Sequence, residues 1–234
     1  MRTLAVRYLL VTIALLCGTS AEGLATSLSV APTRVDLATD ARSGSVSLAN
    51  TGDLATTVQV QTFAWQDGNS IESLEPTRGL LAVPAVFNLP AGGRQVIRVA
   101  SREDVPADVE TAYRMVITEV PSTGPDKGAG IRFALRLSLP VFITPPGATA
   151  VPVWELSADG RSVDVRNDGN PHLHVRGLVV RDQESSRILA DVDSPSYVLA
   201  KAAHSWPDLL PAGTGPVLVE ARTNLGNLSV VLER

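Results

Sequence analysis

The sequence is poor in cysteine, in aromatic residues and in net charge. Its 234 residues include one cysteine, Cys17, which leaves no pair for an intramolecular disulfide, so stability must come from burial alone. Aromatic residues make up only 4% of the chain, which argues against a stacking surface for nucleic-acid bases. The formal net charge is −4, so the chain as a whole attracts neither nucleic acid nor anionic lipid.

The N-terminal segment, which contains that cysteine, has the composition of an export signal. A basic start precedes the apolar run 9–16, and small residues follow it. The run is too short to span a membrane, and we expect no membrane insertion. The sequence therefore predicts a signal peptide over 1–25, cleaved after Ala25, with Ala21 as the alternative. Export without disulfides fits a bacterial periplasm.

The rest of the chain has a β pattern throughout. Short apolar or alternating runs are separated by turns rich in Gly, Asn, Asp and Pro, and no apolar stripe at helical spacing exceeds two turns. Seven such runs precede Pro145-Pro146-Gly147, which indicates a domain junction. Seven short strands at this spacing are typical of an immunoglobulin-like sandwich. The expected strands are 27–37, 45–50, 57–65, 82–89, 94–100, 112–120 and 131–144.

A second series of strands follows the junction, again with turns rich in Gly, Asn and Asp. We therefore predict an all-β protein of two tandem immunoglobulin-like β-sandwich domains, 26–145 and 146–234. An Asn-x-Gly turn recurs early in both, at Asn50 and at Asn167, which hints at duplication. The expected strands of the second domain are 150–156, 162–167, 172–180, 187–192, 196–200, 217–222 and 228–233.

No catalytic constellation is visible in the sequence. It has no G-x-S-x-G nucleophile elbow and no glycine-rich phosphate loop between a strand and a helix. His172 and His174 face the same side of an expected strand, a spacing that can bind zinc, but no third ligand is evident nearby. A strand face beside a turn is the simpler interpretation. We predict that the protein is not an enzyme and holds no metal and no cofactor.

The run 131–144 alternates apolar and other residues for longer than a sandwich needs. At roughly 3.3 Å per residue it extends about 46 Å, whereas about 17–20 Å spans a typical core. Its first half therefore offers apolar side chains and unpaired backbone groups at an edge, which a partner that lacks a strand can use by β-augmentation. A long central strand is the alternative. The side chains concerned are Ile131, Phe133, Leu135 and Leu137.

Several segments, in this order and at this spacing, resemble the periplasmic pilus chaperones of the chaperone–usher pathway, the PapD-like family. The Leu-Pro-Val-Phe sequence that ends the long run resembles the branch that assembles archaic, or spore-coat-protein-U-type, pili. The segments that carry the resemblance are VAPTRVDL (30–37), SLANTGD (47–53), AYRMVITEVP (112–121), ALRLSLPVFITPP (134–146) and NDGNPHLHVRGL (167–178).

The resemblance implies a boomerang arrangement of the two domains and a non-enzymatic function. Such chaperones bind pilin subunits that lack their last strand, donate a strand to keep them soluble, and deliver them to an outer-membrane usher. The donor residues would be Ile131, Phe133 and Leu135, with Leu137 next. The resemblance leaves open whether the free protein caps its own edge as a homo-oligomer.

The resemblance also implies an anchor for the C-terminal carboxylate of the pilin. Arg34 matches the family's arginine, and a guanidinium makes a bidentate pair with a carboxylate. A solvent-facing strand residue is the alternative interpretation of Arg34. The family's lysine falls at Pro140, which carries no charge; Arg98 and Arg136 are candidate replacements, and we expect Arg114 to be structural.

Two other classes of protein compete with this interpretation. A structural pilus or adhesin subunit would also be all-β and exported, but it would carry its alternating run as an N-terminal extension rather than between domains. A carbohydrate-active protein would show clustered tryptophans and paired acids. Trp65, Trp154 and Trp206 are dispersed in the sequence.

Overall fold

Every regular element that the structure describes is a β-strand. The computed structural model contains no helix, among the residues it describes, that is long and apolar enough to cross a bilayer. The expected signal peptide and the expected donor residues Ile131 and Phe133 lie outside those residues. The described residues are 28–66, 74–102, 104, 108–120, 134–212 and 215–233.

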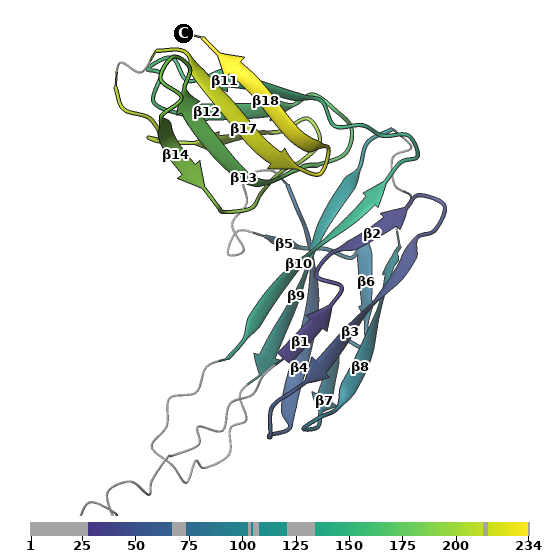
Figure 1. Cartoon of the computed structure of the whole chain (residues 1–234). Helices are drawn as coiled ribbons and strands as arrows, with labels where there is room; N and C mark the ends of the chain where they lie inside the picture. Colours follow the sequence, from purple (N-terminus) through teal and green to yellow (C-terminus); the bar gives the residue numbers. More distant parts are fainter. Residues whose placement is uncertain are drawn as a thin grey trace, which may run out of the picture.

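The N-terminal part of the chain folds into two facing sheets (Figure 1). One sheet has the order β1-β3-β8-β6, and the other has the order β2-β10-β9-β4, with β5 and β7 also paired to β4. The strands are β1 (Leu28–Ala31), β2 (Val35–Ala38), β3 (Ser43–Asn50), β4 (Thr56–Ala64), β5 (Glu75–Pro76), β6 (Leu80–Val83), β7 (Val86–Leu89), β8 (Arg94–Ser101), β9 (Thr111–Val120) and β10 (Arg136–Thr144).

The C-terminal part repeats the two-sheet plan with fewer strands (Figure 1). Its sheets have the orders β11-β12-β16 and β14-β13-β17-β18, and β15 pairs with β13. The strands are β11 (Pro152–Leu156), β12 (Val163–Asn167), β13 (Leu173–Asp182), β14 (Ile188–Val192), β15 (Ser196–Val198), β16 (Ala203–Trp206), β17 (Val217–Thr223) and β18 (Gly226–Leu232).

Each sandwich is held by its own core, which the alternation of the strands produces. In β3, Val46 and Leu48 are fully buried, whereas Ser45 and Ser47, which alternate with them, point outward. The first core gathers residues of both N-terminal sheets, and the second gathers Val163, Val175, Val219 and their neighbours. The predicted all-β fold of two tandem sandwiches is confirmed.

Two predicted strands are each divided, which corrects the sequence analysis. The run 27–37 forms β1 in one sheet and β2 in the other, because the chain crosses between sheets at Pro32. The run 82–89 is divided at Pro84 in the same way, since a proline has no N–H to give to a sheet ladder.

A third apolar cluster joins the two sandwiches, which meet at an angle (Figure 1). Its buried members are Phe63, Trp65, Leu74, Val116 and Phe142 from the N-terminal sandwich and Leu199 from the C-terminal one. Because the cluster lies on the outer face of the β10-β9-β4 sheet, it places that face against the second domain.

Candidate capture site

The strand β10 leaves one of its backbone edges without a partner over half of its length. Along one edge it pairs with β9 from Arg136 to Ile143, and along the other it pairs with β2 only from Val141 to Thr144. Among the described residues, no strand covers the second edge from Arg136 to Pro140. Unpaired N–H and C=O groups of this kind are a template for another strand.

The apolar side chains on one face become progressively less buried toward the N-terminal end of β10. Leu139 is buried in the core, with 3% of its surface exposed. Leu137, two residues earlier on the same face, is only partly buried against that core. Leu135 lies just before the strand and is 36% exposed. This row of apolar side chains, Leu135, Leu137 and Leu139, is therefore neither wholly buried, as in a central strand, nor wholly exposed.

Two arginines flank the proline that replaces the expected lysine. Pro140 lies directly opposite Arg114 of β9 in the antiparallel register. On its other side, the parallel pairing of Val141 with Val35 makes Pro140 and Arg34 neighbours. Since alternate residues of these strands point into the core, the three residues share the outer face of the sheet. The positive charge absent at Pro140 is present on one adjacent strand, at Arg114, and directly before the other, at Arg34.

The guanidinium of Arg114 is held by aromatic rings rather than by a carboxylate. Its central carbon lies 3.5 Å from the centroid of the Trp65 ring and 5.8 Å from that of Tyr197. Burial lowers the pKa of Arg114, partly offset by Tyr197. Among the described residues, no carboxylate forms an ion pair with it. A half-buried cation without a counter-ion is a ready receptor for an anion.

The positive charge of Arg34, unlike that of Arg114, is compensated by a carboxylate. Its Nε donates a hydrogen bond of 2.8 Å to Oδ2 of Asp36. Burial lowers the pKa of Arg34, but the hydrogen bond with Asp36 and the charge of Asp36, aided by Tyr197, raise it overall. Arg34 therefore stays charged, next in the chain to Val35, which pairs with Val141 of β10.

The other two candidate arginines do not join this cluster. Arg98 lies opposite Ser45 in the other sheet and is exposed on the outside of that sheet. Arg136 shares a face with Pro140 but lies four residues, or about 13 Å, earlier along β10. Arg114, which the sequence analysis treated as structural, has the better position. What identifies Arg114 is its position opposite Pro140. That position is known only once the strand register is known.

The two histidines of the expected zinc spacing have other contacts in the structure. Glu110 is buried, and its Oε1 accepts a hydrogen bond from the backbone N–H of His172 and lies 2.9 Å from Nδ1 of the same residue. Its Oε2 accepts a hydrogen bond of 2.7 Å from the hydroxyl of Thr144. His174 stacks on Tyr197 instead. Within the described residues, no three metal-ligating side chains gather at one point.

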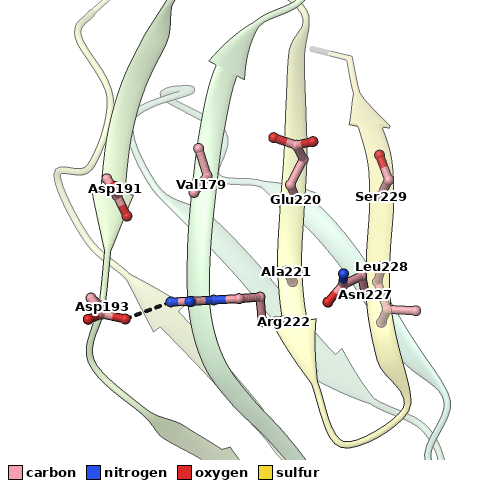
Figure 2. Close-up of a pocket in the computed structure, with 9 residues that line it drawn as sticks. All are labelled: Val179, Asp191, Asp193, Glu220, Ala221, Arg222, Asn227, Leu228 and Ser229. Carbon is pink, nitrogen blue, oxygen red and sulfur yellow. Dashed lines mark hydrogen bonds and ion pairs between the residues drawn. The ribbon is translucent and has the colours of Figure 1, made fainter.

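A hollow of about 480 Å³ on the outer face of the β14-β13-β17-β18 sheet is a separate feature (Figure 2). Arg222 extends across Gly177, where the missing side chain leaves room for its guanidinium, and bonds to Asp193 at 2.6 Å. Because the arginine in its wall already has a carboxylate partner, this hollow is a weaker anion receptor than the Arg114 cluster.

Two immunoglobulin-like sandwiches, with a free strand edge beside arginines at their junction, define the class of protein. The chain belongs to the family of pili and flagellar-assembly chaperones. The model of the PapD N-terminal domain of that family matches residues 27–149, which is just over half of the chain. This is a family of assembly chaperones and not of enzymes, as the sequence analysis predicted. A search of curated protein sequences gives no significant match.

Solved structures of chaperones share the fold over nearly the whole chain. A chain of the CsuC–CsuE chaperone–tip subunit complex of archaic Csu pili from Acinetobacter baumannii is 19% identical, with a TM-score of 0.66, and the match covers 88% of this chain and 98% of that one. The YadV chaperone is 18% identical, with a TM-score of 0.68 and coverages of 88% and 99%. A chain of the Salmonella enterica SafA pilin–SafB chaperone complex is 18% identical, with a TM-score of 0.66 and coverages of 91% and 99%.

Proposed function

We propose that the chain is a periplasmic chaperone that lends β10 and the residues just before it to incomplete pilin subunits. The observation that carries this proposal is the apolar row that leaves the core at Leu139 and becomes exposed at Leu135, beside a free backbone edge. A pilin that lacks a strand can pair with that edge and receive the apolar side chains in its own core.

The proposed donor residues are Ile131, Phe133 and Leu135, with Leu137 next. Each side chain that becomes fully buried in the partner contributes on the order of 1.5–3 kcal/mol. The fold is shared with chaperones solved together with the SafA pilin and the CsuE tip subunit, which supports a pilin as the partner here. The family assignment removes the alternative of a structural pilus subunit.

The proposal includes an anchor for the C-terminal carboxylate of the pilin, made by Arg34 and Arg114. A carboxylate on the outer face at Pro140 would lie between the chain positions of Arg114 and Arg34. It would neutralise Arg114, which has no carboxylate of its own among the described residues, and charge-assisted hydrogen bonds there are strong. Fixing the pilin's end in this way also fixes which of its pockets each donor residue enters.

In the cell, we propose that residues 1–25 direct export to the periplasm and that the captured pilin passes to an outer-membrane usher. The delivery step needs no nucleotide, because the pilin leaves when another strand replaces the donated one. An exported chain without disulfides in its mature part is consistent with that compartment.

Co-expression with a pilin encoded beside this chain tests the proposal. Leu135→Asp should abolish co-purification of the pilin and leave the melting temperature unchanged, because Leu135 is exposed in the free protein. Val96→Asp is the matched control, since Val96 is an exposed apolar residue on the other sheet. Equal pilin recovery with Leu135→Asp and wild type would refute donation of this strand.

A further inference from the structure

The first core ends in a polar pair at the level where the proposed donor row becomes exposed. On β9, Met115 and Ile117 lie in that core, and Glu119 is the next residue on the same face. Thr56 lies at the same end of the core face of β4. Both polar residues are buried, and the Thr56 hydroxyl donates a hydrogen bond of 2.7 Å to Oε1 of Glu119. The apolar interior therefore stops at a buried carboxylate.

The other carboxylate oxygen of Glu119 contacts the backbone of Leu135. The Leu135 N–H donates to Oε2 of Glu119 at 3.4 Å, and the Glu119 N–H donates to the Leu135 carbonyl oxygen at 2.9 Å. In a regular antiparallel pair, the Leu135 N–H would donate to the backbone carbonyl of Glu119 instead. The regular ladder between β9 and β10 begins one residue later, at Arg136 opposite Thr118.

We propose that Glu119 is a positioning residue of the capture strand, which keeps Leu135 out of this chain's own core and so leaves it available to a partner. This inference rests on the proposed function. An apolar side chain at position 119 would continue the core past Ile117 and give Leu135 an apolar surface to pack against. A buried carboxylate offers no such surface, because it must keep its hydrogen-bond donors.

The consequence is that capture adds more apolar burial than it otherwise would. A side chain that is already buried in its own core must leave that core before a partner can bury it, so its transfer contributes little to binding. A side chain that is exposed in the free protein contributes the gain from burial. The affinity for the partner thus depends on a residue of β9, which lies outside the donated strand.

Two variants of equal side-chain length test this inference. Glu119→Gln keeps an oxygen for the Leu135 N–H and an amide group that can donate to the Thr56 hydroxyl, whereas Glu119→Met keeps neither. The first measurement needs no pilin. Leu135→Cys is labelled with a thiol reagent in each variant, with Cys17→Ser to remove the chain's one natural thiol. We expect labelling at the wild-type rate with Gln and about tenfold more slowly with Met, because the thiol would then react only on local opening.

The second measurement is competitive capture of a pilin encoded beside this chain. Wild type and a Glu119 variant, with different tags and with Leu135 intact, are expressed together with the pilin, and the pilin recovered on each is compared. We expect Gln to compete equally and Met to recover about tenfold less, which corresponds to about 1.4 kcal/mol, close to the lower end for burying a leucine side chain. The Met variant should melt no earlier than wild type, because an apolar side chain of similar volume often replaces a buried charge without loss.

The outcomes separate this inference from the proposed function. If wild type recovers pilin and the Met variant recovers it equally, Glu119 does not position the capture strand and the inference is wrong, while donation of the strand stands. If wild type recovers no pilin, the proposed function fails and this inference fails with it. Glu119→Leu is made alongside as a second apolar variant. If neither apolar variant folds, Glu119 is required for the fold itself, and the inference is likewise wrong.

Discussion

The ring of Phe142 lies stacked on the imidazole of His172, with centroids 3.7 Å apart and an interplanar angle of 14°. Phe142 belongs to β10, and the exposed Leu135 directly precedes the other end of that strand. One strand thus runs from the proposed capture edge, past the two arginines, to the contact between the domains. The contact between the domains and the proposed capture edge therefore share one strand, β10.

Replacing Glu110 by alanine should loosen that contact. The change leaves the His172 backbone N–H and the Thr144 hydroxyl without their buried acceptor, at a cost of about 2 kcal/mol or more. We expect a lower free energy of unfolding in urea and a larger radius of gyration by small-angle scattering. Glu155→Ala is the control, because the side chain of Glu155 is 62% exposed. Unchanged scattering would show that Glu110 does not hold the domains together.

Stability should fall below about pH 6.5 partly because of His174. Burial lowers its pKa, and the positive charges of Arg176, Arg34 and His172 lower it further. As the pH falls through the unfolded-state pKa of about 6.5, the unfolded chain takes up a proton that the folded chain does not, so the free energy of unfolding decreases. His174→Gln should therefore reduce the difference in melting temperature between about pH 8 and about pH 5. An unchanged difference would contradict this assignment.

The fold could be predicted from the sequence because alternation and turn residues determine it locally. Val46 and Leu48, for example, are separated by serine and point inward as their spacing requires. The division of the first run at Pro32 was not predicted, because its two halves continue the same apolar alternation in different sheets. Arg34 was found from the resemblance, whereas the placement of Arg114 opposite Pro140 and near Tyr197 depends on strand register and domain contact, which no local pattern contains.

The two Asn-x-Gly turns should differ in their importance for stability. Asn50 and Asn167 are both buried, and each accepts a hydrogen bond from the glycine two residues on. Asn50 also donates to Leu54 and Leu89. Asn167 makes more bonds, because it also accepts from Val151 and donates to Pro171, Val198 and Leu199.

We therefore expect Asn167→Ala to lower the free energy of unfolding by about 2–4 kcal/mol and Asn50→Ala by about 1–3 kcal/mol. Urea denaturation of the two variants measures both values. Asn→Asp at each site serves as a second comparison, because it keeps the acceptor but replaces the donor by an ionisable oxygen, and it should cost at least as much as Asn→Ala. A larger loss at Asn50 than at Asn167 would contradict the hydrogen-bond argument.

The strongest prediction separates packing from capture along a single face of β10. Leu139→Ala removes a side chain from the core and should lower the free energy of unfolding by about 2–5 kcal/mol. Leu135→Ala removes a side chain that is already exposed, so stability should change by less than about 0.5 kcal/mol, while pilin capture weakens by the burial that is lost in the partner. Leu137 is partly buried in the free protein, so Leu137→Ala should lower both the free energy of unfolding and the capture of the pilin. Chemical denaturation and pilin co-purification, carried out on the same three variants, measure the two effects separately. If Leu135→Ala lowered the free energy of unfolding as much as Leu139→Ala, these side chains would all belong to this chain's own core. None of them would then be available to a partner.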